Sequence, residues 1–138
     1  MKRITDLKFV DTYLTEFTGD YRTALEVIDE LPDYTLVTLR DLIDHIIDLI
    51  AAHHNYSLKA ASIFTKIKEL QDASKIDSYL ADLLHSIRIK GNSGAHKKEV
   101  SADTHDQRKD KLRELALSAR EELLEVLKTV SSLLHNKT

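Results

Sequence analysis

The residues best suited to chemistry lie together in residues 88–96, directly after an apolar segment. This stretch reads Arg-Ile-Lys-Gly-Asn-Ser-Gly-Ala-His, and it combines two cations, an amide and an imidazole with two glycines. An arginine can stabilise charge on a phosphate, and a histidine can exchange protons near neutral pH. If a helix resumes at Asn92, then Arg88, Asn92 and His96 recur every four residues along one slanted face. That arrangement would form a phosphate-binding or catalytic site.

A helix that ends within this stretch is the structural alternative. Gly91 would then be the left-handed residue that follows the helix, with Lys90 beside the last carbonyl groups and Asn92 starting a turn. Residues 90–103 show no helical periodicity, which favours this interpretation. It does not account for Gly94, because a second glycine usually lets a backbone or a ligand approach closely. Both interpretations remain open at this point.

A second set of polar residues has the spacing of metal ligands on a helix: Asp41, Asp44, His45 and Asp48. These residues lie opposite the apolar stripe of the predicted helix, so we expect a solvated face. His53 and His54 are expected to end that helix, where a cation favours the negative end of the dipole. The chain has no cysteine, which excludes a disulfide, a thiol nucleophile and cysteine-ligated zinc. We expect neither a metal nor a cofactor.

The elements that position these residues are predicted to be helices. The chain of 138 residues has three glycines and one proline, too few for the turns of a β-sandwich or a Rossmann fold. Apolar residues recur at steps of three and four, which is typical of amphipathic helices. We predict an all-α fold, with one domain over residues 1–138 built as a single bundle of four to five helices. The predicted helices cover about 7–31, 35–54, 58–70, the region after Ser74, and 105–135.

Particular residues set the predicted helix boundaries. Gly19 marks a break in the first helix, and Pro32 ends it because proline clashes with helical continuation. Ser74 is expected to cap the fourth helix, three residues before Asp77. Thr104 with Gln107 forms a capping box for the last helix. In the third helix, Phe64 and Ile67 are expected to face inward.

Charge is unevenly distributed along the chain. With 20 basic and 23 acidic residues the formal net charge is −3, which excludes a strongly basic nucleic-acid binder as a description of the whole. Residues 83–113 nevertheless contain eight basic and four acidic residues. A solvated loop with a charged helix start explains this excess, and a phosphate-binding surface that includes Lys97 and Lys98 is the alternative.

Apolar runs in the chain are far shorter than a membrane span. No apolar core of a signal peptide follows Met1. We therefore expect a soluble cytoplasmic protein without a membrane partner.

This chain resembles the signature of a widespread prokaryotic helical domain of unknown function, Arg-x-x-Gly-Asn-x-x-Ala-His, at these positions: Arg88, Gly91, Asn92, Gly94, Ala95 and His96. Leu39 and Arg40, followed by Asp44, are similar to a Leu-Arg pair and an acid in the second helix of that family. The acid of the family is more often Glu. The resemblance covers about residues 20–130, and the family occurs alone and fused to type I restriction-enzyme subunits and other defence proteins.

That family is commonly grouped with the HEPN superfamily of compact helical bundles, which often dimerise. The resemblance therefore implies a HEPN-like fold and a homodimer, with RNA, a nucleotide or a protein of a defence system as a possible partner. Many superfamily members are metal-independent ribonucleases with a histidine a few residues after an arginine. Here seven residues, including two glycines, separate Arg88 from His96, which weighs against catalysis.

A binding module for RNA, a nucleotide or a protein in prokaryotic defence is the function we favour from the sequence. The alternatives are a metal-independent endoribonuclease and a purely structural dimerisation module. In a ribonuclease, His96 would exchange protons with the RNA 2′-hydroxyl, Arg88 would stabilise the phosphorane, and Asp44 would hold Arg88. The candidate binding residues are Asp44, Lys90, Asn92, Lys97 and Lys98. The residues expected to be structural are Arg40, Gly91 and Gly94.

Overall fold

The structure, a computed structural model, describes residues 5–95 and 104–135. Its elements in chain order are α1 (Asp6–Tyr13), the short 3₁₀ helix η1 (Thr15–Phe17), α2 (Thr18–Glu26), α3 (Pro32–His53), α4 (Ile63–Asp72), α5 (Ser78–Ala95) and α6 (His105–His135). No strand occurs in these two ranges, so the all-α prediction is confirmed. The predicted number of helices is wrong, because the described residues form six α-helices and one 3₁₀ helix.

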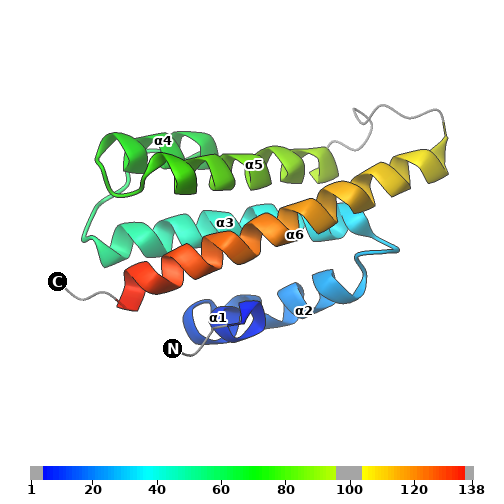
Figure 1. The fold of residues 1–138 in the computed structure, drawn as a ribbon, viewed down its shortest axis with the longest axis horizontal. Coiled ribbons are helices and arrows are strands. Elements are labelled where there is room, and N and C mark those ends of the chain that lie inside the picture. The colour runs from blue at the N-terminus through cyan, green and yellow to red at the C-terminus, as the bar shows by residue number, and fades with distance from the viewer. Residues whose placement is uncertain (1–4, 96–103, 136–138) are drawn as a thin grey trace.

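The helices form three layers, with α4 and α5 on one side, α3 and α6 in the middle, and α1 and α2 on the other side (Figure 1). Helix α3 is central, and it packs against α2, α4, α5 and α6. Its apolar stripe, which includes Ile43, Ile46 and Ile50, is completely buried. None of the helices in residues 5–95 and 104–135 is both long and apolar enough to cross a membrane.

The sequence predicts a break in the first helix near Gly19, but the N-terminal layer is interrupted at Leu14 instead. Leu14 has φ −136° and ψ 53°, outside the helical region. The side chains that follow bind the preceding turn: the Thr15 hydroxyl donates to the Asp11 backbone oxygen at 2.9 Å, and the Thr18 hydroxyl donates to the Asp11 carboxylate at 2.6 Å. Such local hydrogen bonds compete with helix continuation, which accounts for the separate α1 and α2.

Asp6 joins this N-terminal layer to α6. The Tyr21 hydroxyl donates to Asp6 Oδ2 at 2.6 Å, and Arg120 Nη2 lies 3.3 Å from the same oxygen. Burial raises the pKa of Asp6, but hydrogen bonds from Tyr21, the Leu7 backbone N–H and Arg120 together outweigh it and hold that pKa below its ordinary value. Burial and the neighbouring carboxylate raise the pKa of Tyr21. An ionised Asp6 therefore connects α1, α2 and α6.

Two helices begin at residues other than those predicted. Helix α3 starts at Pro32 itself, because the missing N–H of proline costs nothing at the first helical position. Helix α4 starts at Ile63 and not near residue 58. The Glu69 carboxylate accepts hydrogen bonds from the backbone N–H groups of Lys59 and Ala60, which holds those residues outside the helix.

Capping residues are in part those that the sequence predicted. The Thr104 hydroxyl accepts from the Gln107 N–H at 3.0 Å, which confirms the predicted cap of α6. The predicted Ser74 cap is wrong, because Asp77 performs this role for α5 by accepting from the Leu80 N–H at 2.9 Å. Ser74 instead adopts φ 59° in the turn before it. Helix α3 ends at His53, as expected.

Of the two interpretations of residues 88–96, the one that ends a helix at Gly91 is wrong, because α5 continues to Ala95. No glycine in the described part of the chain has a positive φ. A Cβ on Gly91 would lie 2.5 Å from Arg40 Cβ, and one on Gly94 would lie 2.7 Å from Leu36 Cβ and 2.8 Å from a backbone oxygen of α3. The two glycines thus allow α3 to approach α5 closely.

We predict that Gly91→Ala and Gly94→Ala each lower the free energy of unfolding by roughly 1–3 kcal/mol, because the added methyl group overpacks the contact between α3 and α5. Gly19→Ala is the matched control, since nothing lies within 4 Å of its added Cβ. It should retain or gain stability, because alanine favours a helix more than glycine does. Urea unfolding followed by circular dichroism measures all three, and wild-type stability in Gly94→Ala would contradict the close contact.

Candidate functional site

A cation and two rings meet on the outer edge of α5. The Arg88 guanidinium carbon lies 5.1 Å from the centre of the Phe64 ring, and the rings of Phe64 and His85 are 5.3 Å apart. Arg88 Nε donates to His85 Nδ1 at 3.4 Å. Phe64, from α4, is 49% exposed. These three residues form a surface with an accessible aromatic ring and a cation, which we call the Phe64 cluster.

The charge on Arg88 is not neutralised by a carboxylate. No ion pair joins Arg88 to an acidic residue within residues 5–95 and 104–135. Burial lowers the pKa of His85, and the Arg88 charge lowers it further, although Asp82 opposes both. His85 is therefore neutral at pH 7 and can accept the Arg88 hydrogen bond. The Phe64 cluster carries one available positive charge.

Asn92 binds Arg40 of α3 and neither starts a turn nor caps a helix end. Arg40 Nη1 donates to Asn92 Oδ1 at 3.2 Å. Gly91 makes this contact possible, since a side chain at that position would collide with Arg40. Asn92 follows Arg88 by one helical turn on the same face of α5. The structure thus brings Arg40, Arg88 and Asn92 to one edge of the bundle.

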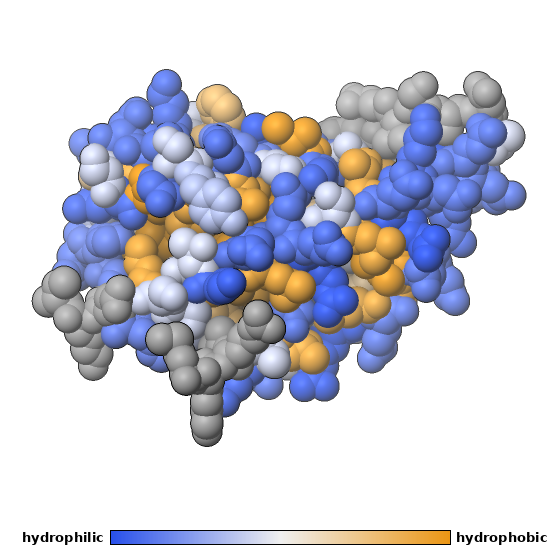
Figure 2. Space-filling model, viewed as in Figure 1, coloured by the Kyte–Doolittle hydropathy of each residue, from blue (hydrophilic) through white to orange (hydrophobic). Residues whose placement is uncertain are grey.

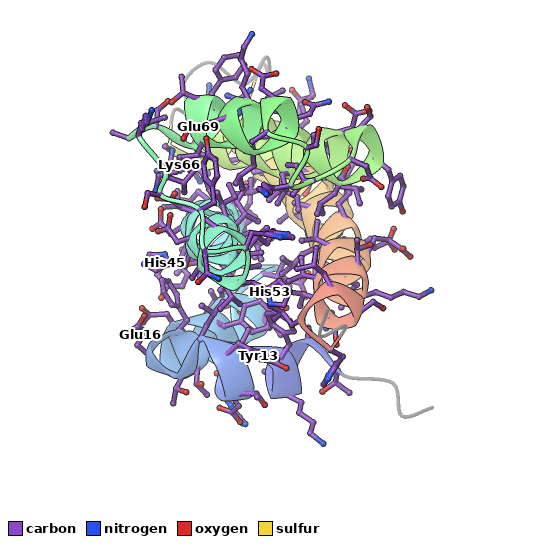
Figure 3. The ribbon with its side chains drawn as sticks, turned by 90° about the vertical axis from the view of Figure 1, so that its left-hand side faces the viewer. Tyr13, Glu16, His45, His53, Lys66 and Glu69 are labelled. Atoms are coloured by element: carbon purple, nitrogen blue, oxygen red, sulfur yellow. The ribbon has the colours of Figure 1, made fainter. Side chains whose placement is uncertain are left out.

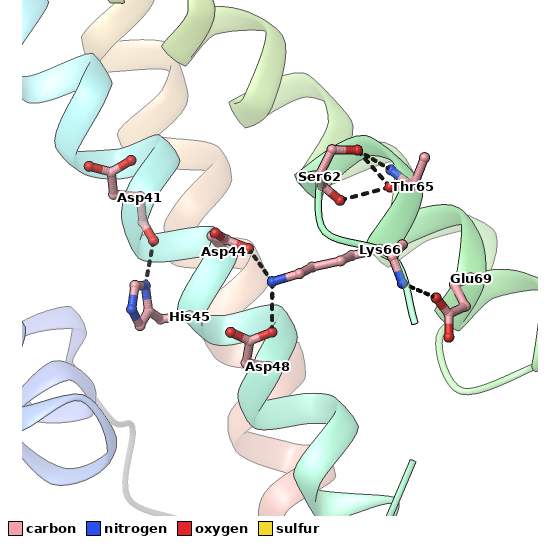
Figure 4. Close-up of polar contacts among 9 residues, drawn as sticks. Asp41, Asp44, His45, Asp48, Ser62, Thr65, Lys66 and Glu69 are labelled. Atoms are coloured by element: carbon pink, nitrogen blue, oxygen red, sulfur yellow. Dashed lines mark hydrogen bonds and ion pairs between the residues drawn. The ribbon is translucent and has the colours of Figure 1, made fainter. Parts of the chain in front are cut away.

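Asp44 does not hold Arg88, contrary to the role predicted for it. Its carboxylate accepts a hydrogen bond from Lys66 Nζ at 3.0 Å, and Asp48 accepts from the same ammonium at 3.0 Å (Figure 4). Lys66 of α4 reaches between the two carboxylates, which are one turn apart on α3. Burial lowers the pKa of Lys66, but the two carboxylates outweigh it and raise that pKa overall. The Asp48 side chain is 52% exposed and that of Asp44 is 32% exposed, so both carboxylates lie on the solvated face that the sequence predicts and pair there with Lys66.

The rest of this side of α3 is polar. His45 Nδ1 donates to the Asp41 backbone oxygen at 3.0 Å, and the His45 ring lies 4.4 Å from the Phe17 ring. Figure 3 shows His45 on the same side of the molecule as Lys66, facing the N-terminal layer near Glu16. In the described ranges, no three His, Asp or Glu residues gather as ligands for a metal ion.

Lys90 lies at the interface between α5 and α6. Its ammonium donates to Glu122 at 2.6 Å, to Ser118 at 3.0 Å and to Ser86 at 3.1 Å. With these three partners, Lys90 is occupied in joining two helices, although the sequence named it a binding residue. The remaining predicted site residues lie outside the described residues: His96, Lys97 and Lys98.

Phe64 and His85 are site residues that the sequence analysis missed. Phe64 was assigned to the inward face of a helix over 58–70, but α4 starts later and leaves the ring half exposed. His85 and Arg88 are three residues apart, a spacing that places them on neighbouring turns of one helix. This spacing was the sequence signal that could have identified His85. No sequence pattern indicated that Phe64 would join them, because α4 and α5 are separate segments.

The three layers of helices define the protein as a small all-helical domain. Arg88, which has no carboxylate partner among the described residues, lies on its edge. The chain belongs to the family described as a domain of unknown function, DUF4145, whose model matches residues 22–137. Helix α1, η1 and the start of α2 precede the matched residues. Comparison with curated proteins and with solved structures found no match.

We predict that Arg88→Ala costs less than about 1 kcal/mol of stability, because within the described residues Arg88 makes a partly exposed aromatic contact and no ion pair. The same change should raise the pKa of His85, since a neighbouring positive charge is removed. Urea unfolding and an NMR titration of the His85 ring measure the two effects. A stability loss of about 3–5 kcal/mol would instead indicate a buried ion pair.

Proposed function

We propose that this DUF4145 domain binds single-stranded RNA through the Phe64 cluster. The observation that supports this function best is the Arg88 guanidinium over a half-exposed Phe64 ring, without a carboxylate partner among the described residues. Unpaired bases stack on aromatic rings and on guanidinium groups, and arginine binds phosphate. The Phe64 cluster therefore offers a stacking surface to the base of a nucleotide and a positive charge to its phosphate.

The distribution of charge supports the same face. Residues 5–53, which form α1 to α3, contain three basic and eleven acidic residues. Residues 54–95, which include α4 and α5, contain six basic and four acidic residues. Lys66 and Lys90 of the second group are already paired with carboxylates of α3 and α6, so the second group is close to neutral and a polyanion is repelled mainly by the first. RNA would therefore approach the layer of α4 and α5, where the Phe64 cluster lies.

We further propose a HEPN-like relationship and a place in prokaryotic defence. The support is the resemblance of the arrangement from Arg88 to His96 to the signature described above. An all-α bundle is compatible with this relationship. The partner in this setting would be foreign RNA or a protein of the same defence system.

Removing either the aromatic ring of Phe64 or the charge of Arg88 should weaken RNA binding. We predict that Phe64→Ala lowers affinity by roughly 5- to 150-fold, the loss of one stacked base. Arg88→Ala should lower affinity and also reduce the slope of log affinity against log salt by about 0.7, the value for one phosphate contact to a single strand. Fluorescence anisotropy of a labelled oligonucleotide at several salt concentrations measures both.

Arg22→Ala is the control for this experiment, because Arg22 is exposed on α2 in the opposite layer. It should leave both affinity and salt slope unchanged. An equal loss in Arg22→Ala and Arg88→Ala would show that binding depends only on total charge. Wild-type affinity in both Phe64→Ala and Arg88→Ala would show that RNA binds elsewhere.

A metal-independent ribonuclease is the second candidate, because the Arg88 guanidinium is also available to a phosphorane. In that case His96 would exchange protons with the 2′-hydroxyl of the RNA. For a binding module we predict no cleavage of RNA in excess chelator, followed by gel electrophoresis. Cleavage by the wild type that is lost in both Arg88→Ala and His96→Ala would establish the ribonuclease instead.

We also propose a homodimer that involves α6. Two leucines two turns apart on this helix, Leu117 and Leu124, are 42% and 41% exposed. Figure 2 shows that the apolar side chains on this face of the molecule are interrupted by polar ones, so the interface would be of mixed character. A second copy that meets the same helix would cover both leucines.

Light scattering coupled to size exclusion should give the mass of a dimer at micromolar concentration. The double change of Leu117 and Leu124 to glutamate should give a monomer, because it places charges in the interface. Leu31→Glu is the control, since Leu31 is exposed in the connection between α2 and α3. A monomeric wild type would contradict the dimer.

A further inference from the structure

We infer that Arg40 and Arg88 together bind the terminal phosphate monoester of an RNA strand, with the Asn92 side chain beside them. This inference rests on the RNA-binding function proposed above. It adds Arg40 to the binding site, and it specifies that the RNA strand ends in a phosphate. The ligand is recognised by its phosphate monoester, which can belong to the 5′ or the 3′ end of the strand.

The first argument is the position of the three side chains. Asn92 follows Arg88 by four residues, so their Cβ atoms are about 5–6 Å apart on one face of α5. Arg40 reaches the same turn from α3, and its Nη1 is 3.2 Å from Asn92 Oδ1. Gly91 keeps the space between the two helices free of a side chain. The Arg40 guanidinium therefore lies at the turn of α5 that contains Asn92, and Arg88 lies one turn before it on the same face of α5.

The second argument is the charge that both arginines retain. The carboxylate paired with Arg40 is that of Asp41, at 3.9 Å from Nε, and the Asp41 side chain is 55% exposed. Such a long, exposed pair contributes little, so a phosphate can replace it. Arg88 has no carboxylate partner within the described residues. Two available positive charges match a phosphate monoester, which carries about −1.5 to −2 at pH 7. An internal phosphodiester carries only one negative charge.

The third argument is the acidic surface beyond Arg40. Asp41, Asp44 and Asp48 follow one another along α3; Lys66 from α4 pairs with Asp44 and Asp48, and Asp41 lies beside Arg40. Three carboxylates against the two cations Lys66 and Arg40 leave this stretch with a net negative charge. A phosphate backbone that continued over α3 would be repelled. The strand therefore ends at Arg40 and extends in the other direction, toward Arg88 and the ring of Phe64.

The experiment compares short RNA strands of one sequence that carry a 5′-phosphate, a 3′-phosphate or hydroxyl groups at both ends. Isothermal titration calorimetry measures their affinities for the full chain. The wild type should prefer one phosphorylated strand by about tenfold or more, the effect of a charged hydrogen bond. Arg40→Lys should lose most of this preference and keep its affinity for the hydroxyl strand, because lysine lacks the planar fork of arginine. Arg22→Ala should retain both.

A second variant leaves Arg40 in place, so that its result does not depend on any role of Arg40 in folding. Asp41→Asn removes the carboxylate nearest to Arg40 and should strengthen binding of the preferred phosphorylated strand without changing the hydroxyl strand. Equal wild-type affinity for all three strands would overturn this inference and leave the proposed RNA-binding function standing. No binding of any strand would overturn the proposed function itself. An Arg40→Lys variant that folds and keeps the full preference would assign the phosphate to other residues.

Discussion

Helices α3 and α5 lie so close together that position 91 and position 94 have no room for a side chain. This contact determines the geometry of the edge where the candidate site lies. Because Gly91 is small, Arg40 can cross to α5 and donate to Asn92. The same register turns Lys90 toward α6, where it binds Glu122. A wider separation of α3 and α5 would break the contact with Asn92 and move Arg88 away from Arg40.

The sequence predicts the helices well where the information is local. Apolar residues at steps of three and four locate the long helices, and Thr104 and His53 mark helix ends that the structure confirms. The sequence leaves the role of Gly91 undecided, because a glycine can end a helix or admit a neighbouring helix. The choice depends on Arg40 and on the rest of α3, some fifty residues away in the chain, so residues 88–96 alone could not decide it.

The same limit applies to the pairing of charges. Asp44 was assigned to Arg88, but Lys66 binds it instead, because α4 packs beside α3 in the folded chain. The positive region at residues 83–113 also contains charges that are already paired. Lys90 binds Glu122 and Arg113 binds Asp29. Only the folded structure separates these paired cations from Arg88, which has no carboxylate partner among the described residues. A count of charges along the sequence therefore overestimates the basic surface, because it includes cations that are already paired with carboxylates.

The attachment of the N-terminal layer through Asp6 has a consequence for unfolding in acid. The pKa of Asp6 is lowered in the folded chain, so its ionised form contributes stability at neutral pH, and this contribution is lost as the pH falls through the lowered value. The contact between α3 and α5 contains methylene groups and backbone atoms, which do not titrate. Acid therefore weakens the attachment of α1 and α2 to α6 through Asp6 and leaves the contact between α3 and α5 unchanged. We expect the backbone amides of α1 and α2 to exchange hydrogen faster at acid pH, because the polar attachment of these helices weakens there.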